Sequence, residues 1–318
     1  MIVTLTPNPS LDRTVTIGGE LVPGSVHRIK EETLDPGGKG INVGLGVARA
    51  QVPTLAVFPA AADDRLLALL DRDGLSYLAT TRTAPVRVNL AIISTPAITT
   101  KVNEPGAEIS AEELRDLVAG LLDATGDGDQ VMMCGALAPG MPKDLYEDLI
   151  PRLHQKGVWV GVDTADETLV SLIEAGPRSA PDFLKPNAHE LGQIMGFDGD
   201  ALEDEAAAGN LTSVAEAAHA LRERGVNEVL VSLGPAGALL ACDEGTWYSP
   251  SPEVPVISTV GAGDSSVAGY LIGKYQQASP PQCLALAVAY GAAAASMPGT
   301  TIPTPEQAPV FPDLVTQL

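Results

Sequence analysis

The stretch Ser258–Ser265 (STVGAGDS) stands directly before a segment, 266–278, that the sequence predicts to be a helix. Its Gly-Ala-Gly segment can present consecutive backbone N–H groups at the helix N-terminus, which is an arrangement that binds anions. Asp264 falls in the first helical turn, where the helix dipole stabilises the charged form of a carboxylate. Phosphoryl transfer needs chiefly positioning and charge stabilisation, so the stretch suits that chemistry. A glycine turn before a well-capped helix, without a ligand, is the alternative interpretation.

A second glycine-rich stretch, Asp35–Val43 (DPGGKGINV), leads into a predicted helix over 40–50. Its glycines let the backbone approach a ligand closely and adopt positive φ. The pattern is neither a Walker A loop, because a glycine follows the lysine, nor a GxGxxG loop. Lys39 and Asn42 are candidate contacts to a sugar or a phosphate, and a simple turn is the alternative.

Short runs of β-branched residues alternate with helix-length segments along the chain. Strands are predicted over 2–6, 54–58, 130–134, 158–162 and 228–232, and helices over 40–50, 111–124, 143–155 and 213–224. This alternation indicates parallel βαβ units and a sheet covered by helices on both faces, which is the α/β class. Ser110, with Glu113 three residues later, predicts a capping box at the helix over 111–124.

Strands without an intervening helix interrupt this rhythm in the first third of the chain. They are predicted over 14–17, 26–33, 86–94 and 98–102, with a turn containing Pro96 between the last two. We expect them to form a small accessory sheet that serves as a lid or a dimer surface. The acidic, Ala- and Gly-rich segment 199–210 predicts a surface loop.

The composition limits the classes of protein that the chain can represent. Of its 318 residues, 45% are hydrophobic and 19% are charged, which is ordinary for a globular protein. The formal net charge of −21 disfavours nucleic acid as a partner. The three cysteines are scattered without metal-binding spacing, so we expect buried free thiols. The most apolar run, 284–296, is too short to cross a membrane, and the N-terminus lacks signal-peptide features, so we expect a cytoplasmic protein without a membrane partner.

Two later motifs are candidate nucleotide contacts. In Lys185–Glu190 (KPNAHE), Asn187 can cap the next helix, and Glu190 lies three residues on. The pair forms either an ordinary capping box or a site that organises water around Mg²⁺ and nucleotide phosphates. The segment Val231–Ala238 (VSLGPAGA) contains a strand end, a turn and another strand, which indicates either a nucleotide contact or a simple hairpin.

Polar residues near the accessory strands are candidate sugar contacts. Asp12, in Thr6–Asp12 (TPNPSLD), follows the first strand and can accept hydrogen bonds from sugar hydroxyls. Arg87, in Arg87–Asn89 (RVN), offers a bidentate contact to a phosphate. Asn103 begins a further short motif, NEPG.

These motifs, in this order from Thr4 to about Thr300, resemble those of the PfkB (ribokinase-like) carbohydrate kinases. The resemblance implies a ribokinase-like three-layer α/β/α sandwich with a mostly parallel sheet and a small β-sheet lid. It implies one kinase domain, 1–318, with lid strands at approximately 11–35 and 85–105. It also implies ATP and Mg²⁺ as cofactors. One departure concerns the lid hinge, because 59–64 reads PAAADD where the family usually has glycine-rich sequence and a Gly-Asp pair.

The resemblance also implies roles for individual residues. Asp264 corresponds to the base that takes the proton of the attacking hydroxyl, and Gly261, Ala262 and Gly263 correspond to the anion hole. The other candidates are Asp12, Gly38, Lys39, Asn42, Arg87 and Asn103 at the sugar, and Lys185, Asn187, Ser232, Gly234 and Gly237 at the nucleotide. Asn187 and Glu190 would hold Mg²⁺ through water.

Within the family, the motifs are most similar to those of members that act on phosphorylated sugars. Lys39 and Arg87 would supply two cations for the phosphate that such a substrate already carries. The expected reaction converts fructose 1-phosphate into fructose 1,6-bisphosphate, with tagatose 6-phosphate and fructose 6-phosphate as alternative substrates. A kinase of an unphosphorylated sugar or nucleoside, and a non-catalytic sugar-phosphate sensor, are further alternatives. Because lid strands have unpaired edges, we expect a homodimer formed through them.

Overall fold

A computed structural model describes residues 1–95 and 98–318, so the predicted turn at Pro96 lies outside the described residues. The main body is built on a ten-stranded sheet with the spatial order β14-β13-β12-β11-β10-β9-β8-β1-β4-β5. Its strands are β1 Ile2–Leu5, β4 Thr54–Ala60, β5 Tyr77–Thr81, β8 Gln130–Cys134, β9 Trp159–Asp163, β10 Phe183–Leu184, β11 Glu228–Ser232, β12 Ala238–Cys242, β13 Gly245–Ser249 and β14 Thr316–Gln317. The strands from β5 to β11 in this order are parallel, and β12, β13 and β14 continue the sheet in antiparallel fashion.

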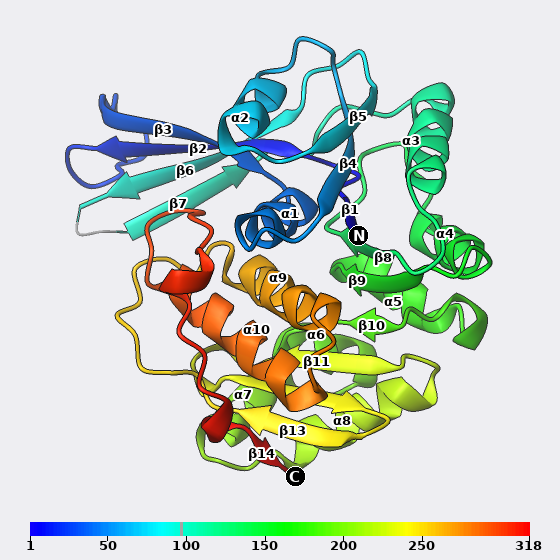
Figure 1. Ribbon diagram of the computed structural model, residues 1–318. Coiled ribbons are helices and arrows are strands. Elements are labelled where there is room, and N and C mark those ends of the chain that lie inside the picture. The colour runs from blue at the N-terminus through cyan, green and yellow to red at the C-terminus, as the bar shows by residue number, and fades with distance from the viewer. Residues whose placement is uncertain (96–97) are drawn as a thin grey trace.

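Helices cover both faces of this sheet (Figure 1). They are α1 Lys39–Arg49, α2 Arg65–Asp73, α3 Ala111–Asp123, α4 Leu145–His154, α5 Asp166–Glu174, α6 Ala188–Met195, α7 Gly199–Ala207, α8 Thr212–Glu223, α9 Ala262–Tyr275 and α10 Pro280–Ala295. Successive residues of β8 separate the two faces. Val131 and Met133 join the core beneath α3 to α8, whereas Met132 and Cys134 join the core beneath α1, α9 and α10. The predicted three-layer sandwich is therefore confirmed.

A separate four-stranded sheet projects from one side of the main body (Figure 1). Its strands, in spatial order, are β3 Ile29–Gly37, β2 Ser10–Ile17, β6 Arg87–Ser94 and β7 Ile98–Asn103. The central pair, β2 and β6, is parallel, and the two outer pairs are antiparallel. This small sheet is the predicted accessory sheet. Its strands β3 and β7 are its two edges.

Several elements differ from the prediction. The strands predicted over 14–17 and 26–33 are β2 Ser10–Ile17 and β3 Ile29–Gly37. The segment 199–210, predicted to be a loop, contains the helix α7, because Asp198 caps its first turn and Leu202 and Ala206, four residues apart, bury on one face. The helix predicted over 266–278 begins earlier, at Ala262, because Gly261 adopts a left-handed conformation with φ 78° and turns the chain into the helix. It ends at Tyr275.

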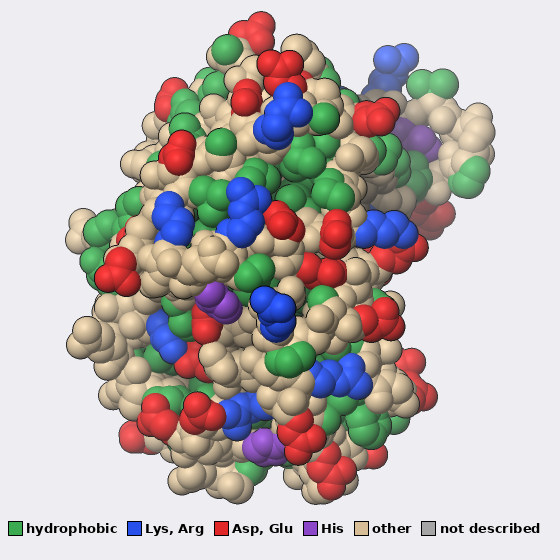
Figure 2. Space-filling model, turned by 90° about the vertical axis from the view of Figure 1, so that its right-hand side faces the viewer, with side chains coloured by type: hydrophobic (Ala, Val, Ile, Leu, Met, Phe, Trp, Pro, Cys, Tyr) green, Lys and Arg blue, Asp and Glu red, His purple; other side chains and the backbone are tan. Residues whose placement is uncertain are grey.

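The remaining sequence-based expectations concern the cysteines, the membrane and the charge. All three cysteines are buried free thiols, as predicted. Over residues 1–95 and 98–318, no helix has the length and apolar character needed to span a bilayer. Figure 2 shows acidic and basic side chains interspersed on the face that carries α3 and α4.

Candidate active site

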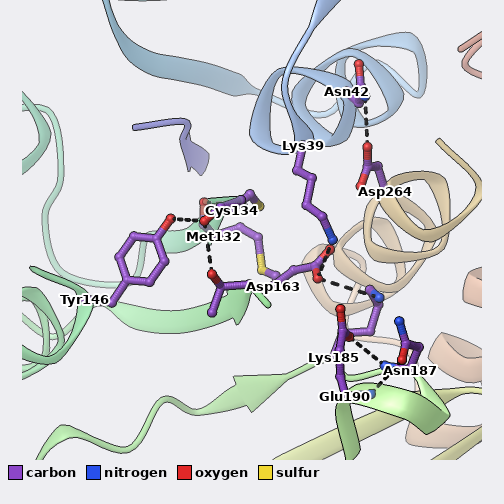
Figure 3. A network of polar contacts seen from close by, with 12 residues as sticks. Lys39, Asn42, Met132, Cys134, Tyr146, Asp163, Lys185, Asn187, Glu190 and Asp264 are labelled. Atoms are coloured by element: carbon purple, nitrogen blue, oxygen red, sulfur yellow. Dashed lines mark hydrogen bonds and ion pairs between the residues drawn. The ribbon is translucent and has the colours of Figure 1, made fainter. Parts of the chain in front are cut away.

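The site is centred on the N-terminus of α9, where Asp264 lies in the first helical turn with 7% of its surface exposed. Asn42 of α1 donates a hydrogen bond from Nδ2 to Oδ2 of Asp264 over 2.8 Å (Figure 3). The two helices begin at the carboxyl ends of the parallel strands, which is where α/β sheets place their ligands. A carboxylate so placed can accept a proton from a substrate hydroxyl.

Burial raises the pKa of Asp264, because desolvation disfavours its charged form. The positive charge of Lys39 and the hydrogen bond from Asn42 act in the opposite direction. The net result is a carboxylate that is a stronger base than an exposed aspartate, which suits the removal of a proton from a hydroxyl.

Two lysines converge on a buried carboxylate that sequence reasoning did not single out. Lys39 Nζ lies 3.0 Å and Lys185 Nζ lies 3.7 Å from Oδ1 of Asp163, the last residue of β9 (Figure 3). Burial disfavours the charged form of Asp163, but the two lysines outweigh it and hold the pKa of the carboxyl below its usual value. Likewise, burial opposes the charge of Lys39, while Asp163 and Asp264 raise the net pKa of this lysine. The site therefore holds two cations beside two carboxylates.

Glycines allow these groups to come close together. A Cβ on Gly40 would lie 2.4 Å from Thr6 Oγ1 and 2.8 Å from the carbonyl oxygen of Leu5, so only glycine lets α1 start this close to β1. A Cβ on Gly263 would lie 3.6 Å from Lys185 Nζ. Lys185 thus faces the start of α9, next to the expected anion hole at 261–263.

Three of the predicted sugar contacts, Asp12, Arg87 and Asn103, form a second group on the small sheet, whereas Lys39 and Asn42 lie on α1 in the first group. Asp12 Oδ1 accepts hydrogen bonds from Ser10 Oγ over 2.9 Å and from Asn89 Nδ2 over 3.0 Å. Burial raises the pKa of Asp12, and the charge of Arg87 acts against this. Arg87 begins β6 and donates from Nη1 to the carbonyl oxygen of Glu104 over 3.1 Å.

One chain turn connects this second group to the first. A Cβ on Gly37 would lie 2.3 Å from Asp12 Oδ1, so Asp12 faces the turn that leads through Gly38, at φ 112°, into Lys39. On the small sheet, Asn103 ends β7 opposite Asn89 and is exposed. The structure thus places Asp12, Gly38 and Arg87 near one another, with Asn103 at the rim.

The predicted nucleotide contacts form a third group. Asn187 caps α6 by accepting a hydrogen bond from Glu190 N, and Glu190 Oε2 accepts one from Asn187 N, each over 2.8 Å. The pair is therefore a capping box, as one of the two interpretations predicted. The charge of Glu190 also favours the protonated form of Lys39, which connects this group electrostatically to the site centre.

The turn that follows β11 lies beside this capping box. Ser232 forms an isolated parallel bridge with Asn187, and its N–H donates to the carbonyl oxygen of Pro186 over 3.1 Å. Gly234 and Gly237 both have positive φ, and a Cβ on Gly237 would lie 2.1 Å from the carbonyl oxygen of Ser249. The segment is a strand, a tight turn and an antiparallel strand, which is the predicted hairpin geometry.

The model of the pfkB family carbohydrate kinases matches residues 8–307 of this chain. The chain belongs to this family. The 1-phosphofructokinase of Xanthomonas campestris is 33% identical over 292 residues, covering 91% of this chain and 89% of that protein. The 1-phosphofructokinase of Escherichia coli is 32% identical over 300 residues, covering 93% and 91%.

Solved structures of PfkB-type kinases agree with this assignment. Phosphofructokinase-2 of Escherichia coli, in complex with substrates and products, matches with a TM-score of 0.85 and 27% identity over 96% of each chain. Ribokinase of Thermotoga maritima, 20% identical, matches with a TM-score of 0.73 over 97% of each chain and shares the fold. As a PfkB protein, the chain is an ATP-dependent carbohydrate kinase.

Mg²⁺ is the metal that the PfkB family implies. The residues that the structure describes fit a Mg²⁺ ion that is shared with substrate phosphates and water, and they do not form a cage of protein ligands. Within the described ranges, no three Asp, Glu, His or Cys side chains converge to form a cage for a metal. Mg²⁺ in kinases is usually held by one or two carboxylates, water and substrate phosphates. Glu190 and the buried Asp163, whose Oδ2 has no hydrogen-bond partner, are the carboxylates at this edge that fit such a role.

Proposed function

We propose that the protein transfers the γ-phosphoryl group of ATP to a hydroxyl of fructose 1-phosphate and releases fructose 1,6-bisphosphate. The observation that carries this proposal is the near full-length similarity to curated 1-phosphofructokinases, at 32–33% identity for the two relatives described above. Lys39, whose charge acts on Asp264, and Arg87, whose charge acts on Asp12, support a phosphorylated substrate, because each places a cation near a carboxylate that would meet the sugar.

In the proposed reaction, Asp264 takes the proton of the attacking hydroxyl as the oxygen bonds to the γ-phosphorus. The bond between that phosphorus and the bridging oxygen of ADP breaks, and ADP keeps the electron pair. The backbone N–H groups of Gly261, Ala262 and Gly263 would stabilise the moving phosphoryl group. Asp12 and Asn42 would orient the sugar, and Arg87 would bind the phosphate that the sugar already carries.

ATP would lie along the turn after β11, with Lys185, Asn187, Ser232, Gly234 and Gly237 as its contacts. Mg²⁺, when bound, would neutralise phosphate charge, held through water by Asn187 and Glu190, with Asp163 as a further carboxylate at the same edge. The capping box supports this placement, because its two hydrogen bonds hold Asn187 and Glu190 together at the first turn of α6. That the protein works in the cytoplasm remains a prediction from its sequence.

Fructose 6-phosphate is a second candidate substrate, with tagatose 6-phosphate as its close alternative. The observation that favours it is the match to Escherichia coli phosphofructokinase-2 in complex with fructose-6-phosphate, with a TM-score of 0.82 and 28% identity. The two candidates differ in the position of the resident phosphate, so one substrate panel separates them.

The test is ADP release with Mg-ATP across fructose 1-phosphate, fructose 6-phosphate, tagatose 6-phosphate, fructose and ribose, for the wild type and Asp264→Asn. We expect fructose 1-phosphate to have the highest kcat/KM. Loss of the base should lower kcat by about 10²–10⁴-fold. Turnover of free sugars alone would refute the phosphate role of Lys39 and Arg87. If no sugar is turned over while ATP still binds, the sensor alternative gains support.

We also propose that two copies of the chain associate through the small sheet. Apolar side chains line a groove of about 230 Å³ on this sheet: Val15, Ile17, Leu21, Ile29, Leu90 and Ile92. Val26, Ile29 and Ile98 are 90%, 48% and 56% exposed. A second copy would cover these side chains and the free edge of β7. Escherichia coli phosphofructokinase-2, a 28% identical relative, has a tetrameric inhibited form.

A further inference from the structure

Two loops connect the main body to strands β6 and β7 of the small sheet. The first, 82–86, runs from β5 to β6 and ends just before Arg87. The second, 104–110, runs from β7 to α3 and begins just after Asn103. Because both expected substrate contacts are strand ends next to these loops, the shape of the loops decides where Arg87 and Asn103 lie.

Arg82 connects the two loops directly. Its side chain is buried, with 5% of the residue exposed, and Nη2 donates to the carbonyl oxygen of Ala107 over 2.5 Å. Ala107 lies three residues from Glu104, whose carbonyl oxygen accepts the hydrogen bond from Arg87. Asn8 Nδ2 donates to the carbonyl oxygen of Pro105 over 3.0 Å. The second loop is therefore held by side chains from three different segments, and one of them is an expected phosphate contact.

Two carboxylates hold the first loop. Glu113 Oε1 accepts from Thr83 N over 2.9 Å and from Thr83 Oγ1 over 3.1 Å, and its other oxygen accepts from Ser110 N over 2.8 Å. Asp64 Oδ2 accepts from Val86 N over 2.9 Å, while Oδ1 caps α2. Asp64 belongs to the segment that departs from the family pattern, and the contact shows that this aspartate fastens the start of β6.

The role of Arg82 cannot be to keep Glu113 ionised. Hydrogen bonds from the backbone N–H groups of Ser110 and Thr83 already lower the pKa of Glu113 to about 2. Arg82 itself is held at an energetic cost, because burial lowers its pKa and its Nε has no hydrogen-bond partner. An apolar side chain of similar length would fill the same space without that cost. What such a side chain would lack is the hydrogen bond to Ala107.

We propose that Arg82 is a positioning residue for phosphosugar binding: it fixes the loop 104–110 and, through Glu104, the guanidinium of Arg87. The proposal rests on the proposed function, since it assumes that Arg87 binds the phosphate of the substrate. Among the described residues, Arg82 forms no hydrogen bond or ion pair with the nucleotide group. Its removal therefore affects the sugar side of the site and leaves the ATP side unchanged.

The test compares Arg82→Met with Arg65→Met, a matched control that removes the exposed arginine at the first position of α2. Misplacement of a binding group by about 1 Å can cost up to about 100-fold, so we expect R82M to raise the KM for the phosphosugar by about tenfold or more. The KM of R82M for ATP should stay within about twofold of the wild-type value. In R65M, the KM values for ATP and for the phosphosugar should both stay within the same range. Amide hydrogen exchange over 104–110 should be faster in R82M than in the control.

Unchanged phosphosugar KM and unchanged loop exchange in R82M would overturn the proposal. So would an equal rise in both KM values, which indicates a general loss of structure. If R82M does not fold, Arg82→Leu and Arg82→Gln, which remove the guanidinium that bonds to Ala107, carry the test. Normal phosphosugar KM with normal exchange in either folded variant refutes the proposal. A wild type that turns over no phosphosugar contradicts the proposed function instead, and the loop exchange then still decides whether Arg82 holds the loop.

Discussion

Asp264 is a buried carboxylate whose surroundings act on its proton in opposite directions. Burial favours the protonated form, whereas Lys39 and the amide of Asn42 favour the charged form. A general base works only when it is deprotonated, so activity must fall as the pH falls through the pKa of Asp264. The acid limb of the rate profile thus reports on each neighbour of this one side chain.

Removal of the Asn42 amide should move that limb. In Asn42→Ala, the carboxylate loses a hydrogen bond that favours its charged form, so the pKa of Asp264 rises further. We expect the acid limb of kcat to shift to higher pH, measured as a pH–rate profile at saturating ATP and sugar. Asn210→Ala, at an exposed position, serves as the control. An unshifted limb with a lower kcat would mean that Asn42 only orients the sugar.

Asp163 should contribute to stability as well as to the site. In Asp163→Asn, Lys39 and Lys185 remain close together without their shared counter-charge. Removing one partner of a buried pair costs about 3–5 kcal/mol, and we expect about 3 kcal/mol because Lys39 is partly exposed to water. Urea unfolding of the variant, beside the exposed control Asp313→Asn, measures the loss.

The pH dependence of this loss has a definite sign. The pKa of Asp163 is lowered in the folded state, so its contribution is complete above the unfolded value of about 3.9. It is lost as the pH falls through the folded value. The stability gap between wild type and Asp163→Asn should therefore be widest near neutral pH and close in acid. A gap that stays constant down to low pH would contradict the ion-pair explanation.

At the residue scale, the sequence predicted those contacts that local motifs carry. The capping boxes at Ser110 and Asn187 were predictable because each needs only two residues three positions apart. Asp163 was not, since no motif surrounds it and its partners lie on α1 and after β10. The available signal was positional: Asp163 directly follows the predicted strand 158–162, at the edge of the sheet where Lys185 follows β10.

At the scale of elements, glycines decide how closely α9 and α10 pack. A Cβ on Gly269 would lie 2.4 Å from the carbonyl oxygen and 2.8 Å from the carbonyl carbon of Leu286 in α10. Backbone atoms of a packed helix cannot move aside as a flexible side chain can. The short distance between these helices therefore depends on the missing side chain.

We accordingly expect Gly269→Ala to destabilise the protein by about 1–3 kcal/mol or more, the range for overpacked cores. Gly44→Ala is the comparison, because its Cβ would meet Thr4 Oγ1 at 3.3 Å and Leu75 Cδ1 at 3.5 Å. These are side-chain atoms, so the change should stay within about 1 kcal/mol, the difference in helix propensity. Thermal unfolding of both variants measures the contrast, and equal stabilities would show that α10 can shift away.

Some of the elements that the sequence did not predict depend on neighbours. The strands β10 and β14 have two residues each, and their extended form comes from pairing with β9, β11 and β13. The helix α7 contains acidic and small residues, and only two buried side chains hold it against the rest of the core. Short segments of this kind carry too little periodicity to be recognised before their partners are known.

At the scale of the whole molecule, the order of strands and helices was predictable and the association of chains was not. Alternating strands and helices favour a parallel sheet, because a crossover helix returns the chain to the same edge. The edge strands of the small sheet have unpaired backbone groups, which indicates only that another segment or chain covers them. Which surface does so depends on complementarity between two copies, and a single sequence does not encode that in any local pattern.

The proposed dimer gives a further prediction. Ile29→Asp puts a charge into the apolar groove of the small sheet, where a second copy would have to bury it. We expect the wild type to have twice the chain mass of 32.8 kDa and the variant to have the mass of one chain, measured by size-exclusion chromatography with light scattering. Phe197→Asp, an exposed apolar residue outside the small sheet, is the control. A wild-type mass equal to that of one chain would contradict the proposed dimer.

The hydrogen bond between Asn42 and Asp264 joins residues that are 222 positions apart. A ribosome that adds about 5–20 residues per second delivers the second partner about 10–45 s after the first. Throughout that interval the nascent chain contains α1 but not yet α9. Val43 and Val47 therefore lack the helix that later completes their core. A growing chain therefore acquires its catalytic base close to the end of translation, and until then its N-terminal half presents apolar surface that a chaperone can bind.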